Sequence, residues 1–159
     1  MNVILSTDLD APAAVVWREV CTPRLLRYVA APLQTFVPLQ PPVWPEVWRE
    51  GAYQVQLQLL GVFSLGPHWI VLSFPAEGQT SGRGQFELRD RGHGRLVRIW
   101  DHLITVQALP GDRARYTDRV EVHAGVLTPF IWLFAQGFYR HRQRRWRLLV
   151  RRRFQFPGG

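Results

Sequence analysis

Apolar and polar residues alternate over most of the chain between Tyr53 and His123. The first such run sets Tyr53, Val55, Leu57 and Leu59 between glutamines, which is typical of a strand with one buried and one hydrated face. Similar runs, separated by Gly or Pro turn signals, predict four more strands: His68 to Phe74, Gly84 to Arg89, Leu96 to Gln107 and Arg113 to His123. Short turns between them favour an antiparallel meander with one apolar face.

The N-terminal part predicts one strand and two short helices. Asn2 to Asp8 has the composition of a strand, and a helix is expected to begin at Ala11-Pro12. Thr22-Pro23 ends that helix and opens a second one. Ala31 to Gly51 contains five prolines, which exclude a central strand or a long helix. We expect an ordered loop there, with a short edge strand near Gln34 to Val37.

The stretch from Gly125 to Arg153 predicts one long helix. Thr128 is suited to cap it and Pro129 to occupy its first turn. Its first half is apolar nearly all round and its second half is rich in arginine, so we expect the first half to cover an apolar pocket. One face carries apolar residues at helical spacing: Leu127, Ile131, Phe134, Phe138 and Leu149.

The net charge of +8 comes entirely from arginine, because the chain of 159 residues contains no lysine. Much of the excess lies between Arg140 and Arg153, at the end of the predicted helix, where the helix dipole favours cations. The basic run lacks the context of a known nucleic-acid-binding motif, which argues against a nucleic-acid partner. The length is that of one domain, residues 1–159.

Several features favour a cytoplasmic location. The sequence contains no run of eighteen apolar residues and no signal-peptide pattern at its N-terminus. Cys21 is the only cysteine, so no internal disulfide is available, and we expect it to be a buried structural thiol.

The order of elements resembles the START-like, helix-grip superfamily (SRPBCC), which includes polyketide cyclase/dehydrase-like and lipid-transfer proteins. The resemblance is carried by DLDAPAAVVWREVCTPRLLRYV, WREGAYQVQLQLLGVFSLG and YTDRVEVHAGVLTPFIWLF. It implies an α+β helix-grip fold, in which a curved antiparallel β-sheet wraps a long C-terminal α-helix, with two short helices after the first strand. It also implies an apolar cavity between sheet and helix. A fold of this kind does not determine whether a protein is a carrier or an enzyme.

Strand and helix periodicity predict which side chains line such a cavity. The alternative is that the same side chains close into a solid core. Trp44 and Trp48, in the proline-rich loop, are expected either to form the entrance or to seal the loop onto the core. The predicted lining comprises Tyr53, Val55, Leu57, Leu59, Phe86, Leu88, Tyr116, Val120, Val122, Phe130, Phe134 and Phe138.

Two carboxylates share the predicted inward face. Asp101 has the parity of Val97, Ile99 and Leu103, and Asp118 has the parity of Tyr116 and Val120. A buried carboxylate needs a partner or a raised pKa.

Arg142 and Arg145 fall on the inward helix face, so ion pairs of Asp101 and Asp118 with these arginines are one interpretation. The other is that Asp101, Asp118 or Tyr116 binds a polar ligand group or acts as an acid or base. A shift of strand parity by one residue would turn both acids toward solvent.

The histidines suggest no metal site, because no pair has metal-motif spacing. His102 and His123 have the opposite parity to the acids and are expected on the solvent side. We therefore expect no metal and no cofactor.

The favoured function is binding of a hydrophobic or amphipathic small molecule (a lipid, polyketide or quinone-like compound) by a monomer or dimer. The first alternative is a cyclase or dehydratase-type enzyme that uses inward Asp and Tyr residues. The second is a docking module that uses the arginine-rich helix end, with Trp146, Leu148, Leu149 and Val150, on an anionic membrane surface or a protein.

Overall fold

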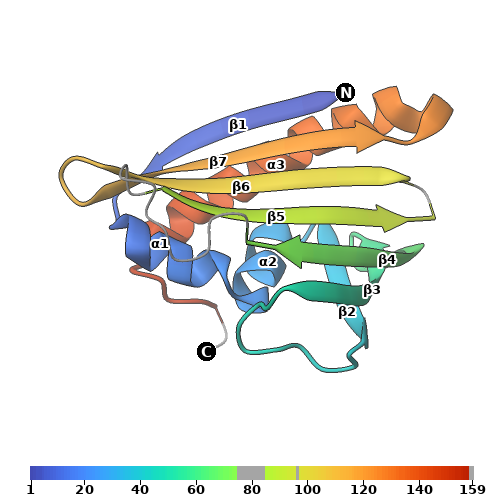
Figure 1. The fold of residues 1–159 in the computed structure, drawn as a ribbon, viewed down its shortest axis with the longest axis horizontal. Coiled ribbons are helices and arrows are strands. Elements are labelled where there is room, and N and C mark those ends of the chain that lie inside the picture. Colours follow the sequence, from blue (N-terminus) through green and yellow to red (C-terminus); the bar gives the residue numbers. More distant parts are fainter. Residues whose placement is uncertain (75–84, 96, 158–159) are drawn as a thin grey trace.

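The computed structural model describes residues 1–74, 85–95 and 97–157. Its elements follow the predicted order (Figure 1). They are β1 (Asn2–Leu9), α1 (Ala13–Val20), α2 (Pro23–Ala30), β2 (Gln34–Gln40), β3 (Gly51–Leu59), β4 (Phe63–Ser73), β5 (Gln85–Gly94), β6 (Ile99–Leu109), β7 (Arg113–His123), a 3-10 turn η1 (Gly125–Leu127) and α3 (Thr128–Arg151). The predicted strand bounds Gly84 and Leu96 lie outside the described residues.

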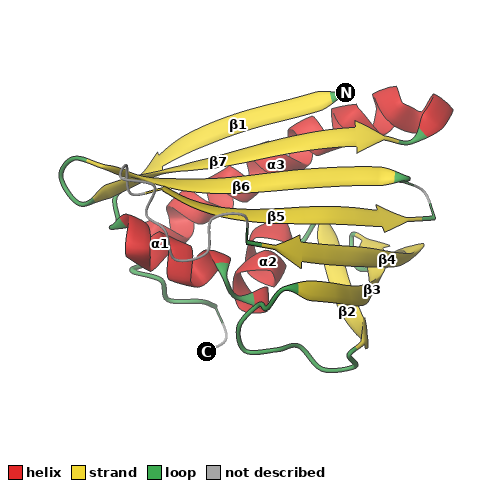
Figure 2. Cartoon of the chain, in the orientation of Figure 1, coloured by secondary structure: helices red, strands yellow, loops and turns green. Residues whose placement is uncertain are grey.

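The strands form one curved antiparallel sheet in the order β1-β7-β6-β5-β4-β3-β2. The long helix α3 runs across the sheet, and α1 and α2 pack on the same side (Figure 2). This is the predicted helix-grip fold. The edge strand β2 is longer than expected and contains Pro38 at a shift of register, where a proline is tolerated.

The helix starts agree with the sequence in one case and differ in the other. Thr22 caps α2 by accepting a hydrogen bond from the backbone N–H of Leu25 at 3.2 Å. Thr128 is already inside α3, and its hydroxyl accepts from the N–H of Ala124 at 2.9 Å instead of capping the helix. The hydroxyl therefore stabilises the bend between β7 and α3.

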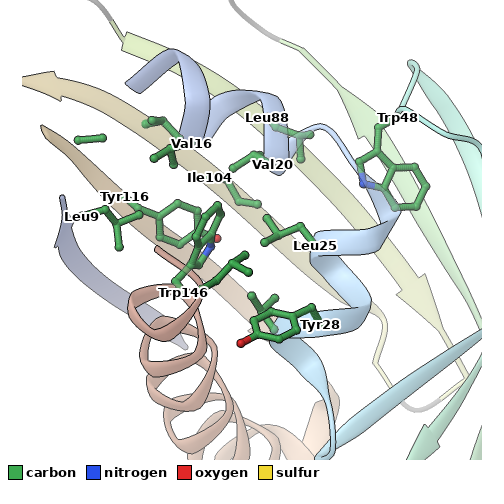
Figure 3. Close-up of a cluster of buried hydrophobic side chains, with 14 of the residues drawn as sticks. Leu9, Val16, Val20, Leu25, Tyr28, Trp48, Leu88, Ile104, Tyr116 and Trp146 are labelled. Atoms are coloured by element: carbon green, nitrogen blue, oxygen red, sulfur yellow. The ribbon is translucent and has the colours of Figure 1, made fainter. Parts of the chain in front are cut away.

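The interior divides along α3 into a packed half and a hollow half. At the packed half, α1, α2 and the C-terminal half of α3 close onto the sheet around Trp146 and Tyr116, both fully buried (Figure 3). Such close packing of large side chains supplies most of the apolar burial that stabilises a fold. The N-terminal half of α3 packs on β7 through Ala135, Phe138 and Tyr139 and in addition covers a cavity.

Candidate functional site

The cavity lies between the N-terminal half of α3 and strands β2 to β6, with a volume of about 300 Å³. Aromatic side chains from α3 form one wall, and aliphatic side chains of the sheet form the opposite wall. The mixture of a mainly apolar lining and a few polar groups is typical of small-molecule sites. Its lining is Leu26, Gln34, Phe36, Leu57, Leu59, Leu65, Pro67, His68, Ile70, Asp90, Arg95, Val97, Trp100, His102, Phe130, Ile131, Phe134, Phe138, Tyr139 and Arg142.

The cavity opens beside the beginning of α3 and the β3–β4 turn. Phe130 lines the cavity and is nevertheless 73% exposed, and Arg95 on the β5–β6 connection is exposed as well. These segments lie at the same end of the molecule (Figure 1). Apolar side chains of these segments are exposed, and we call them the apolar rim: Leu60, Val62, Phe63, Val126 and Phe130. The first half of α3 covers the cavity, as its composition predicts, and leaves Phe130 exposed beside it.

Only part of the predicted lining reaches the cavity. Leu57, Leu59, Phe130, Phe134 and Phe138 do. The others face inward but lie in the packed clusters: Tyr53, Val55, Phe86, Leu88, Tyr116, Val120 and Val122. Strand parity identified the inner face, but which part of that face is covered by packed helices depends on where α1, α2 and α3 cross the sheet.

A buried polar cluster lies where the cavity meets the packed core. The Oδ1 atom of Asp118 accepts from the hydroxyl of Tyr116 at 2.7 Å and lies 2.8 Å from Nε2 of His102. The Oδ2 atom accepts from Nε2 of Gln143 on α3 at 3.4 Å. Asp118 has no exposed surface, and these contacts explain how a carboxylate is tolerated there.

The protonation states of the cluster follow from its contacts. Burial pushes the pKa of Asp118 upward, but the contacts with His102 and Tyr116 and the charge of Arg142 outweigh it and lower the pKa below its ordinary value. Burial also lowers the pKa of His102, more than the contact with Asp118 raises it. Asp118 is therefore ionised and His102 is neutral at neutral pH, and Nε2 of His102 donates the hydrogen bond.

Arg142 comes from α3 and reaches the same cluster. Its Nη2 atom donates to the hydroxyl of Tyr116 at 3.3 Å and lies 3.8 Å from Oδ1 of Asp118. Its guanidinium carbon is 5.3 Å from the centre of the Tyr139 ring. Arg142 lines the cavity and is only 4% exposed, so its charge is directed into the protein.

Asp90 and His68 bring two further titratable groups to the cavity wall. Asp90 accepts a hydrogen bond from the backbone N–H of Val71 at 2.9 Å, and burial raises its pKa to about 7. Burial lowers the pKa of His68 to about 4, so the imidazole is neutral at neutral pH. Its ring lies against β5, where a Cβ atom added at Gly92 or Gly94 would come within 2.7 Å of a ring nitrogen.

Three predicted placements are wrong. Asp101 faces away from the cavity and pairs with Arg89 on β5, with Nε 2.8 Å from Oδ1, and this pairing lowers the pKa of Asp101. His102 takes the inward position instead. Among the residues that the structure describes, Arg145 contacts no acid: its Nε and Nη2 donate to the backbone carbonyl of Tyr28, and its guanidinium stacks on the Tyr28 ring. Arg145 therefore fastens α3 to α2.

Trp44 and Trp48 do not line the cavity. Trp48 is buried, and its ring packs edge-on against the rings of Trp44 and Tyr53. The two tryptophans thus attach the proline-rich loop to the packed core, which was the alternative to an entrance.

Cys21 is partly buried, and burial raises its pKa to about 11, so it remains a neutral thiol. Across the described residues, no group of three His, Cys, Asp or Glu side chains is arranged to hold a metal ion.

Sequence patterns missed His102, Asp90 and His68. On β6 both faces carry apolar residues, so alternation alone does not identify the inner face. On β5 the predicted strand ended at Arg89, yet extending the alternation of Phe86 and Leu88 by one step would have placed Asp90 inward. The glycines at 92 and 94 on the same face were a second signal, because glycine in a strand often marks a close approach of another group.

The fold recurs in solved structures whose sequences are only distantly similar. A START superfamily protein from Mycobacterium smegmatis aligns with a TM-score of 0.56 and 12% identity over 95% of this chain and 97% of that one. The Zhui aromatase/cyclase from Streptomyces sp. R1128 aligns with a TM-score of 0.60 and 13% identity over 100% and 98%. Norcoclaurine synthase from Thalictrum flavum aligns with a TM-score of 0.52 and 11% identity over 90% and 92%.

These similarities assign the fold: the chain has the helix-grip architecture of START-like proteins. No protein-family model matches the sequence, and a search of curated proteins finds no relative. Function must therefore be argued from the site. In the described part of the chain, no helix is long and apolar enough to cross a membrane.

Proposed function

We propose that the protein binds an amphipathic small molecule in the cavity under α3. The observation that carries this proposal is the cavity itself, about 300 Å³ in volume, with aromatic side chains of α3 on one side and a polar inner end. Burial of an apolar ligand body against Phe134 and Phe138 would supply most of the binding free energy. The polar groups at the inner end would orient the ligand.

The structural neighbours support this kind of partner. One is a START superfamily protein, and two others are an aromatase/cyclase and norcoclaurine synthase. We expect proteins of this fold to hold a hydrophobic compound between the sheet and the C-terminal helix. We propose that the cavity of this chain binds a compound in the same place. The identity of the ligand, the oligomeric state and the expected cytoplasmic location remain predictions.

The proposal is tested with native mass spectrometry and with an apolar fluorescent probe, N-phenyl-1-naphthylamine. A co-purified apolar compound, or saturable probe binding, is expected for the wild type. Phe134→Arg places a charge in the cavity and should abolish probe binding. Leu133→Arg is the matched control, because Leu133 neighbours Phe134 on α3 but is 66% exposed outside the cavity lining. Equal probe binding by both variants, or none by the wild type, would refute the cavity proposal.

Exchange of the ligand with an anionic membrane is a second candidate function, favoured by the apolar rim. Phe63 and Phe130 are 63% and 73% exposed, Arg95 lines the same cavity as Phe130, and Arg95 and Arg98 are both exposed on the β5–β6 connection. An apolar patch flanked by cations is suited to an anionic lipid surface. The arginine-rich end of α3 considered from the sequence lies at the far end of the same helix (Figure 1).

An enzymatic function of the cyclase type would need an acid or base at the cavity. Asp101 is excluded by its outward position. Tyr116 lies in a packed cluster, and its hydroxyl and Asp118 belong to the buried hydrogen-bonded group. Within residues 1–74, 85–95 and 97–157, Asp90 is the one carboxyl group that lines the cavity. Asp90 is therefore the carboxyl group to substitute in a search for enzymatic activity.

A further inference from the structure

Arg142 uses little of its hydrogen-bonding capacity within the protein. A guanidinium has five N–H donors. Within the described residues, Arg142 makes one hydrogen bond, from Nη2 to the hydroxyl of Tyr116 at 3.3 Å. Its Nε atom is buried and has no acceptor in the part of the chain that the structure describes. Buried donors without acceptors are unfavourable, and here they belong to a charged side chain that lines the cavity.

Asp118 neutralises Arg142 only partly. The distance from Nη2 to Oδ1 is 3.8 Å, which is too long for a hydrogen bond. Both oxygens of Asp118 already accept from Tyr116, His102 and Gln143. The carboxylate is thus held by other donors, and the guanidinium retains the capacity to bind a second anion.

The remaining polar groups of the inner wall do not oppose an anion strongly. His68 and His102 are neutral at neutral pH, because burial lowers the pKa of each. Asp90 is the competing acid, and burial raises its pKa to about 7, so a substantial fraction is protonated at neutral pH. A protonated carboxyl group can donate a hydrogen bond to an oxyanion.

We propose that Arg142 binds a carboxylate at the head of an apolar ligand, so that the ligand class is a hydrophobic carboxylic acid. This inference rests on the proposed function and names its ligand. The planar guanidinium matches a carboxylate, and such charge-assisted hydrogen bonds are stronger than neutral ones. The apolar body then extends past Phe138 and Phe134 toward the opening at Phe130.

The test compares two competitors that differ only in the head group. Decanoate and decan-1-ol are titrated against the uncharged probe N-phenyl-1-naphthylamine, bound to the wild type. Decanoate should displace the probe at a concentration at least tenfold lower. The Arg142→Met, Asp118→Asn double variant removes both charges together, so that no buried charge is left alone. In this variant the preference for decanoate should disappear, while binding of the probe remains.

Arg145→Met is the matched control, because Arg145 lies one turn further along α3 and contacts Tyr28 outside the cavity lining. It should keep the preference for decanoate. Equal displacement by acid and alcohol in the wild type would overturn the carboxylate inference while leaving the cavity proposal intact. The same conclusion follows if the preference persists in the double variant. Failure of the probe to bind the wild type would overturn both.

Discussion

Asp90 on β5 and His102 on β6 are direct cross-strand partners, and both side chains line the cavity. They connect the wall of the cavity to the buried cluster around Asp118. The inner face of the sheet therefore carries a row of titratable groups across β5, β6 and β7.

The raised pKa of Asp90 predicts a pH-dependent stability. In the unfolded chain this group ionises near pH 4, whereas in the native protein its pKa is about 7. The native state therefore holds a proton that the unfolded state has lost, and stability falls as the pH rises from about 4 to 7. Asp90→Asn removes this titration. It should raise Tm by about 3 °C or more at pH 8 and much less at pH 5, measured by circular dichroism. An equal shift at both pH values would contradict the assignment.

Asp118 and Asp101 should differ strongly in their contribution to stability. Asp118→Ala leaves Arg142 without its nearby carboxylate in a buried position and should lower the free energy of unfolding by about 3–5 kcal/mol. Asp101→Ala breaks a pair with Arg89 on the outer face, where solvent screens the charges, and should cost about 1 kcal/mol or less. Urea unfolding of both variants measures the difference. Similar losses would mean that Asp101 has a structural role the observed contacts do not explain.

The fit of the His68 ring against Gly94 can be measured as an energetic coupling. A Cβ atom at Gly94 would lie 2.7 Å from Nδ1 of His68 and 3.2 Å from the backbone oxygen of Pro67. Gly94→Ala should therefore destabilise the protein by about 1–3 kcal/mol. Once His68→Ala has removed the ring, the same change should cost at least about 1 kcal/mol less. A double-mutant cycle in urea checks this, and additive effects would show that the ring and the glycine do not press on each other.

The apolar rim predicts binding to anionic vesicles. Val62→Ser with Phe63→Ser should reduce co-sedimentation with phosphatidylglycerol vesicles at least tenfold, because both side chains are apolar and exposed at the β3–β4 turn. Salt should weaken the binding through screening of Arg95 and Arg98. Arg147→Gln with Arg151→Gln, at the other end of α3, is the control and should change binding less. A larger loss in the control than in the rim variant would favour the arginine-rich end as the membrane contact.

The fold could be predicted because its determinants are local and repeated. Alternation marked the strands, turn residues separated them, and Thr22-Pro23 marked the boundary between the two short helices. The placement of Arg142 beside Asp118 also followed from periodicity, since the inner faces of β7 and α3 were both clearly apolar. Where one face is distinctly apolar, the period of the element determines which side chains meet.

The rest of the site depended on information that a single strand does not contain. On β6, Ile99, Asp101 and Leu103 are as apolar a set as Trp100, His102 and Ile104, so the inner face is chosen by the register with β5 and β7. Arg145 lies close to Arg142 on the helical face, but its environment is set by α2, whose position the sequence did not specify. The boundary between cavity and core likewise follows from helix placement.

Along α3, the residues that hold the helix against the sheet are largely different from those that line the cavity. In many binding proteins the same residues must both stabilise the fold and contact the ligand. Trp146 and Leu149 hold the helix against the sheet, about one and two turns beyond Arg142, where the cavity ends. Cavity side chains outside the packed clusters, such as Leu59 and Phe130, can therefore be exchanged to suit a new ligand while the second half of α3 keeps the helix in place. We expect this architecture to be a favourable starting point for redesigning ligand specificity, with cavity substitutions confined to one end of a scaffold whose stability is secured at the other.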